Sequence, residues 1–99
     1  MPEAARLGDM DEGHECFPPT AIIAGSPDVL INNMPAVRKG DALFMDICPC
    51  PFMVHGMSPR MMAEGSATVL INGMPAVRVG DAVDTGGAIG AGSPDVLIG

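Results

Sequence analysis

The sequence predicts a small all-β fold, a cone of three pseudo-threefold β-hairpin repeats closed by N- and C-terminal half-repeats, with a metal at the apex. First, the unit "GSPDVLINNMPAVRKGD" at 25–41 returns at 65–81 as "GSATVLINGMPAVRVGD", with thirteen of seventeen positions identical. Second, the two halves of this unit recur separately at the two ends of the chain. Third, every histidine and cysteine falls between the repeats.

Each unit has the pattern of a β-hairpin. Two short apolar runs rich in β-branched residues, "VLIN" and "MPAVR", flank the dipeptide Asn72-Gly73 in the second copy. Asn-Gly is a strong hairpin signal, because a tight primed turn needs positive φ at both central residues. The first copy has Asn32-Asn33 there, and asparagine tolerates positive φ better than most residues. The unit is therefore predicted to be a hairpin closed by a second sharp turn at its Gly-Asp end.

A third repeat is split between the chain ends. Residues 92–99, "GSPDVLIG", match the first half of the unit, and residues 1–9, "MPEAARLGD", match the second half with one inserted residue. Joining these halves completes a third hairpin and removes exposed strand edges by closing the ring. The alternative, two hairpins with two frayed tails, gives no reason for tails that carry complementary halves. We expect residues 1–99 to form one domain.

Composition excludes some functions. The 99 residues carry a formal net charge of −7, which opposes binding to nucleic acid or to an anionic membrane surface. No apolar stretch is long enough to span a membrane, and the first residues do not resemble a secretory signal. We therefore expect a soluble chain made in the cytoplasm.

The connections between repeats, residues 10–24, 42–64 and 82–91, are predicted to emerge at one end of the ring. Each finishes in a short apolar run before Gly-Ser, which we expect to form a further strand over the small core. They also contain all the candidate metal ligands: His14, Cys16, Cys48, Cys50 and His55. Convergence of the connections would bring these side chains together, and zinc takes four such ligands.

We expect His14 and His55 to bind the metal with two of the three cysteines, Cys16 and Cys50 ahead of Cys48. Zinc is the expected ion and iron the alternative, because both accept these ligands. The Cys-x-Cys and His-x-Cys spacings are not standard zinc spacings. Two other interpretations stay open: cysteines buried as small apolar residues, and an oxidised cysteine pair.

The repeated charges favour a structural function over catalysis. Asp9, Asp41 and Asp81 recur at one position of the unit, and Arg6, Arg38 and Arg78 at another. We expect the aspartates to accept turn N–H groups, and the arginines to pair with them or with a partner. A catalytic site is usually unique, and no known catalytic motif is present, so we do not expect an enzyme.

The motifs "PAVR" and "EAAR", each followed by x-Gly-Asp, with "GSPDVLI" and "GSATVLI", resemble the proline-alanine-alanine-arginine (PAAR) repeat proteins over essentially the entire chain. This resemblance implies a structural tip that caps and sharpens the trimeric VgrG-type spike of a type VI secretion system. It also implies puncture of a target membrane, effector attachment, and delivery of the cytoplasmic protein out of the cell with the spike. No fused toxin domain is visible, so an effector would attach non-covalently.

The resemblance also bears on the site residues. Gly13-His14 and His55-Gly56 match ligand histidines of the family, and Cys48 or Cys50 stands where another histidine is common. The family often has a cysteine where this chain has Thr85, which makes Cys16 the natural fourth ligand. For spike binding we expect Asn33, Met34, Gly73 and Met74 at the hairpin turns, with valines and isoleucines of "VLI"; the alternative is that the methionines and valines are core. The alternative functions are a stand-alone metal-binding adaptor unconnected with secretion, and a phage tail spike tip.

Overall fold

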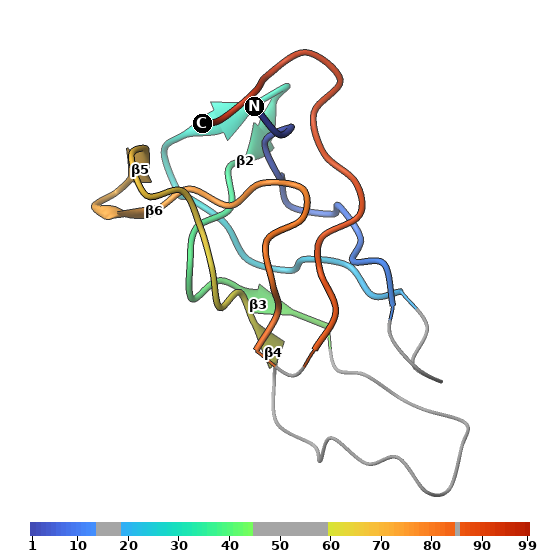
Figure 1. The fold of residues 1–99 in the computed structure, drawn as a ribbon. Helices are drawn as coiled ribbons and strands as arrows, with labels where there is room; N and C mark the ends of the chain where they lie inside the picture. Colours follow the sequence, from blue (N-terminus) through green and yellow to red (C-terminus); the bar gives the residue numbers. More distant parts are fainter. Residues whose placement is uncertain (14–18, 45–59, 85) are drawn as a thin grey trace, which may run out of the picture.

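The structure is a computed structural model that describes residues 1–13, 19–44, 60–84 and 86–99. Its six short strands are β1 (Leu30–Ile31), β2 (Met34–Pro35), β3 (Ala42–Leu43), β4 (Arg60–Met61), β5 (Leu70–Ile71) and β6 (Met74–Pro75). They pair as three antiparallel two-stranded sheets, β1-β2, β3-β4 and β5-β6 (Figure 1). The described residues form no helix of the length and apolarity that a membrane crossing requires.

Both complete repeats form the predicted hairpins. In the first, Leu30 pairs with Pro35 and Ile31 with Met34, and β5 and β6 have the equivalent register. The turn residues Asn32 and Asn33 have φ of 54° and 65°, and Asn72 and Gly73 have 54° and 77°. Both turns are therefore primed turns with positive φ at both central positions, as the sequence predicts.

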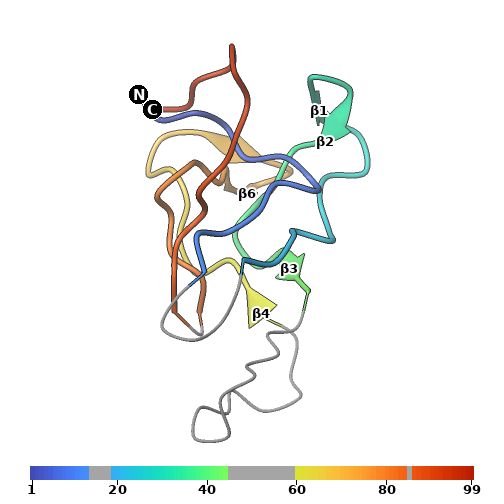
Figure 2. The same ribbon diagram turned by 90° about the vertical axis from the view of Figure 1, so that its right-hand side faces the viewer.

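The chain ends complete the third hairpin. Glu3 pairs with Leu97 in an antiparallel bridge, the counterpart of the pairing between Leu30 and Pro35. The N–H of Ala4 donates to the carbonyl of Val96 at 2.9 Å, and the N–H of Ile98 donates to Pro2 at 2.9 Å. Figure 2 shows the two termini side by side at the end of the molecule that also holds β1 and β2. The prediction of a closed ring of three hairpins is confirmed.

A cyclic set of backbone hydrogen bonds joins the three repeats at the centre of the ring. The N–H of Ala5 donates to Val77 at 3.0 Å, Val77 donates to Val37 at 2.9 Å, and Val37 donates back to Ala5 at 3.3 Å. All three side chains are almost completely buried. Each repeat therefore contacts both others, so that no repeat ends the array.

Close backbone packing explains the glycine of each Gly-Ser pair. A Cβ built on Gly65 would lie 2.7 Å from the Cβ of Pro75 and 2.8 Å from its carbonyl oxygen. Gly25 and Gly92 meet equally close neighbours. The following serine donates its N–H to the backbone at this point, from Ser66 to Ala76 at 2.7 Å. A side chain at the glycine would separate these two segments of the repeat.

The connections return to the ring in extended pairing, but of the three runs expected to be strands only the second forms one, β4; the first and third pair through isolated bridges. Antiparallel bridges join Ile22 to Leu43, Met62 to Val83, and Asp11 to Ile89, so each connection pairs with its neighbours around the axis. The apolar residues of these bridges form one core cluster with Ala5, Val37 and Val77. A second cluster lies among the hairpins and contains Ile31, Ile71 and Ile98 with three alanines.

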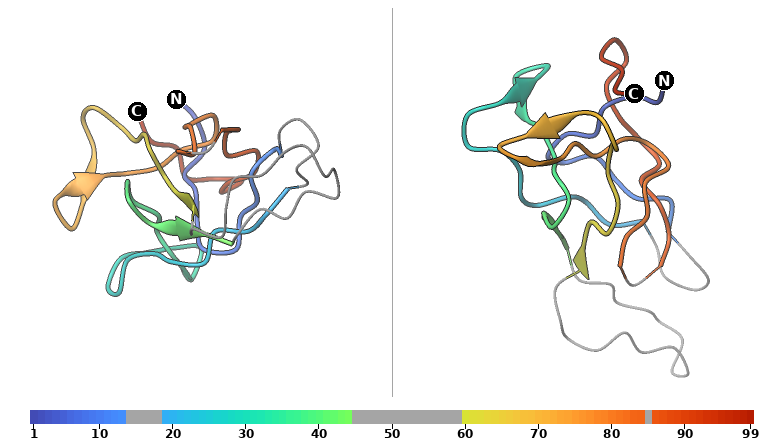
Figure 3. Two further views of the ribbon diagram at one scale, coloured as in Figure 1. Left: turned by 90° about the horizontal axis from the view of Figure 1, so that it is seen from below. Right: turned by 60° about the vertical axis from the view of Figure 1, so that its left-hand side comes forward.

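The molecule therefore has two different ends. The hairpin end carries β1-β2, β5-β6 and the paired termini, and the connection end carries β3-β4 together with the residues that flank 14–18, 45–59 and 85. Figures 1 and 3 show the described parts of all three connections reaching the same end, opposite the termini. This arrangement agrees with the predicted cone.

Candidate functional site

The hairpin end presents three apolar side chains at equivalent positions of the repeat. Leu30, Leu70 and Leu97 are 58%, 61% and 49% exposed. The residues that follow them, Ile31, Ile71 and Ile98, are buried in the second core cluster. Side chains alternate between the two faces of a strand, so the leucines face away from the core that holds the isoleucines. They form a threefold set, which we call the leucine triad.

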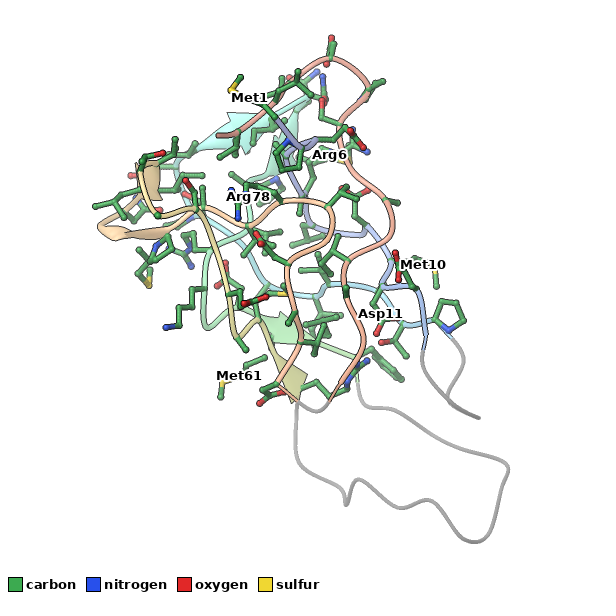
Figure 4. The ribbon with its side chains drawn as sticks, in the orientation of Figure 1. Met1, Arg6, Met10, Asp11, Met61 and Arg78 are labelled. Atoms are coloured by element: carbon green, nitrogen blue, oxygen red, sulfur yellow. The ribbon has the colours of Figure 1, made fainter. Side chains whose placement is uncertain are left out.

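The four predicted contact residues lie on the same end. Asn33 and Gly73 are exposed at the tips of the two complete hairpins, while Met34 and Met74 are half-buried at the starts of β2 and β6. In the split repeat Pro2 takes the place of these methionines, and Met1, at the turn position, is 79% exposed near the paired termini (Figure 4). The isoleucines expected at this surface are core residues instead, and the leucine triad was missed. Strict alternation within "VLI" was the signal that could have identified it.

Polar networks tie neighbouring hairpins together beside the triad. The hydroxyl of Ser26 donates to the side-chain oxygen of Asn72 at 2.7 Å, and the amide nitrogen of Asn72 donates to Asp28 at 2.8 Å. Ser26 also accepts the N–H groups of Asp28 and Val29 at 3.2 and 2.9 Å. Ser93, Asn32 and Asp95 repeat the arrangement at a second junction.

These networks act on the acidic groups. Hydrogen bonds from Asn72, and then from Ser26, hold the pKa of Asp28 below its usual value. Asn32 and Ser93 lower the pKa of Asp95 in the same way. Both carboxylates are favoured in their charged form because their neighbours donate to it.

The third junction differs from the other two. Thr68 stands where the other repeats have Asp28 and Asp95, and Gly99 stands where they have an asparagine. The Ser66 hydroxyl still crosses the junction, donating to the carbonyl oxygen of Gly99. The serine contact is thus kept at all three junctions, while the asparagine–aspartate pair is present at two.

Each Gly-Asp turn is closed by an arginine–aspartate clamp. In the clamp of Arg38 and Asp41, the backbone N–H and Nε of Arg38 donate to Oδ2 at 2.7 and 3.0 Å, and Nη2 donates to Oδ1 at 2.9 Å. Arg6 with Asp9 and Arg78 with Asp81 repeat this geometry. The hydrogen bond to the aspartate is the main cause of the raised arginine pKa in each clamp. The aspartates accept turn N–H groups as predicted, and the arginines pair within the chain.

The predicted metal ligands His14, Cys16, Cys48, Cys50 and His55, together with Thr85, lie outside the described residues. Within residues 1–13, 19–44, 60–84 and 86–99, no three His, Cys, Asp or Glu side chains group closely enough to hold a metal ion. The ligand set therefore stays a prediction.

Three hairpins in a ring, with an exposed leucine on each and the connections at the opposite end, define a small module with pseudo-threefold symmetry. The PAAR motif family model matches residues 13–91, and the chain belongs to this family. PAAR-motif proteins are known from spike tips of type VI secretion systems, generally associate with VgrG spike proteins and form a structural family. No curated protein matches the chain.

Proposed function

We propose that this protein caps a trimeric VgrG-type spike, one copy per trimer, with its hairpin end against the spike. The leucine triad carries the proposal. A partner with true threefold symmetry offers the same surface three times, and a pseudo-threefold ring can meet all three copies at once. Asn33, Met34, Gly73 and Met74 would contribute the contacts around the triad.

The leucine triad would supply part of the free energy of binding. Burying a leucine fully contributes about 1.5–3 kcal/mol, and roughly half of each triad side chain is still exposed for a partner to cover. Each leucine would then contribute about 1 kcal/mol, or about fivefold in affinity. The three sites lie on separate hairpins, so their contributions should add approximately.

The test is co-elution of the purified protein with the C-terminal β-helical tip of a spike trimer from the same organism, with mass from light scattering. We expect one copy per trimer. Leu70→Ala should weaken binding about fivefold and the triple alanine variant about a hundredfold. Ile23→Ala is the control, because Ile23 is 53% exposed but lies in the first connection, next to the bridged residue Ile22. A triple variant that binds like the wild type would exclude the leucine triad as the contact surface.

Absence of any complex at micromolar concentrations would reject the capping function itself. Two hypotheses would then remain, a stand-alone metal-binding adaptor and a phage tail tip.

We also propose that the connections hold one zinc ion, or iron in its place, through His14 and His55 with two of Cys16, Cys48 and Cys50. Imidazole and thiolate are donors that zinc prefers. Support comes from Gly13, Thr20, Arg60 and Gly86, which flank the segments carrying these residues and lie near one another at the connection end. Metal analysis of the purified protein should give one ion per chain, and His14→Ala with His55→Ala should lose it. Cysteine-to-serine variants, one at a time, would identify the thiolates.

In this proposal the protein acts mechanically. It waits in the cytoplasm, leaves the cell with the spike, helps the spike to puncture a target membrane, and offers its outer surface to effectors. A secretion assay that detects the protein outside cells only when the contractile system fires would test its location.

A further inference from the structure

Arg60 is buried at the connection end and contacts all three connections. Its side chain is 1% exposed. Nη1 donates to the hydroxyl of Thr20 at 2.7 Å, and Nη2 donates to the carbonyl of Gly86 at 3.0 Å. Nη2 also lies 2.8 Å from Oδ2 of Asp11. Since Asp11 and Thr20 belong to the first connection and Gly86 to the third, one guanidinium from the second connection joins the other two.

Asp11 occupies a position that is apolar in the other two connections. It bridges to Ile89, just as Leu43 bridges to Ile22 and Val83 to Met62. All three positions are buried, with Leu43 0%, Val83 3% and Asp11 3% exposed. A strictly threefold core would have a third apolar residue here, so a carboxylate breaks the symmetry within the core itself. Figure 4 shows Asp11 in the half of the molecule nearer the connection end.

The site is built to accept this carboxylate. Oδ1 accepts the N–H of Thr20 at 2.8 Å and that of Gly13 at 3.2 Å. Oδ2 accepts no hydrogen bond from the described residues, so its compensation is the charge of Arg60. A buried carboxylate without a partner is costly, and removal of one member of a buried ion pair is more damaging than replacement of both.

Space for the arginine comes from the same departure from symmetry. The register of each connection pairs Leu43 with Arg60, and places Thr20 opposite Asp11 and Gly87 opposite Val83. One large side chain is therefore combined with two small ones in this layer. The three sectors of this layer therefore differ in the sizes of their side chains.

We infer that the Arg60–Asp11 pair is a clasp that holds the connection end in one arrangement, independently of any bound metal. Buried ion pairs contribute little net stability compared with apolar packing, and their best-attested use is to select one structure among alternatives. Here the alternatives are rotations or looser packings of three similar connections on a symmetric ring. The inference does not rest on spike binding.

The test measures amide hydrogen exchange in the presence of excess chelator. The informative amide is that of Val83, which donates to the carbonyl of Gly87 at 3.0 Å in the connection that contributes neither member of the pair. The reference is the Val77 amide at the centre of the ring. Wild-type protein should keep both amides protected with the chelator present. If the chelator removed the protection of the Val83 amide but not that of the Val77 amide, the connection end would depend on a bound metal, and the inference would be wrong.

The variants are Arg60→Met and the double variant Asp11→Leu/Arg60→Met, which restores an apolar residue at position 11. We expect exchange at Val83 to rise about tenfold or more in both, while Val77 in the double variant changes little. Arg38→Met is the comparison variant, because it removes another arginine–aspartate contact and lowers stability generally, so that exchange at Val83 should rise no more than exchange at Val77. A double variant with wild-type protection at Val83 would overturn the inference, because apolar packing would then suffice.

Asp11→Asn supplies a second measurement if the double variant does not fold. It keeps an acceptor for the N–H groups of Gly13 and Thr20 and loses only the charge opposite Arg60. Exchange at Val83 should rise about fivefold relative to Val77, and an unchanged ratio would contradict the clasp.

Discussion

The repeated arginine–aspartate clamps allow a prediction in which the molecule supplies its own control. Arg38 makes two hydrogen bonds beyond its clamp: Nη1 donates to the Asn72 side chain at 3.1 Å, and Nη2 to the carbonyl of Gly25 at 3.3 Å. Among the described residues, Arg78 donates only to Asp81. Arg38→Met should therefore destabilise the protein more than Arg78→Met, although both remove the same clamp.

The difference can be worked from these bonds. A hydrogen bond to a charged group contributes about 1.5–3 kcal/mol, but the bond to Asn72 is exposed and the one to Gly25 is long, so the two together should contribute about 1–2 kcal/mol. For a domain of this size, each kcal/mol shifts the melting temperature by about 4–8 °C. Arg38→Met should then melt about 4–16 °C below Arg78→Met.

The assay is thermal unfolding followed by circular dichroism at one protein concentration, with denaturant unfolding as a second measure. Arg6→Met should behave like Arg38→Met, because Arg6 makes the same additional bonds to Asn32 and Gly92. Equal melting temperatures for Arg38→Met and Arg78→Met, or a lower one for Arg78→Met, would refute the reasoning.

Three further predictions concern the hairpins. Gly65→Ala should lower the free energy of unfolding in urea by about 1–3 kcal/mol, because the added Cβ would lie 2.8 Å from the carbonyl oxygen of Pro75. An unchanged urea midpoint would show instead that the backbone moves to make room for the added Cβ. Asn33→Gly should change the free energy of unfolding by less than about 0.5 kcal/mol, since glycine suits a φ of 65°. Asn32→Gly should lower it by at least about 1 kcal/mol, because the hydrogen bonds of the Asn32 side chain are lost, and equal effects of the two variants would contradict this. The pKa of Asp28 in the folded state lies below the unfolded value of about 3.9, so the stability that this carboxylate contributes is present above that pH and is lost as the pH falls through the folded value. Asp28→Asn should therefore flatten the decline of the urea midpoint below about pH 4, and a decline as steep as in the wild type would contradict this.

Much of the fold could be predicted because the repeat is nearly identical in amino-acid sequence from copy to copy. The turn dipeptides, the split third repeat and the return strands of the connections all follow from local signals and from the need to close a ring. The leucine triad could have been predicted by applying strand alternation to Leu30 and its neighbours, and it was missed because all apolar residues of the run were considered together.

Other parts depend on contacts that no local pattern encodes. Asp11 resembles an ordinary loop aspartate in the sequence, and Arg60 an ordinary loop arginine, forty-nine positions later. The core position of Asp11 becomes visible only from the bridges between the three connections, in which it takes the place that Leu43 and Val83 have in the other two. The residues expected to bind metal stay a prediction for a different reason, since they lie outside the described part of the chain.

The pairing of the first residues with the last has a consequence for how the protein is made. Residues 2–4 leave the ribosome about ninety residues before their hydrogen-bond partners, residues 96–98. The hydrogen bonds of Ala5 at the centre of the ring should form late as well, because Ala5 directly follows residues 2–4 in the chain. Contacts of such wide sequence separation form slowly. The ring should therefore close only after residues 96–98 have been synthesised, and until then its two finished hairpins present open edges that the cell must keep from aggregating.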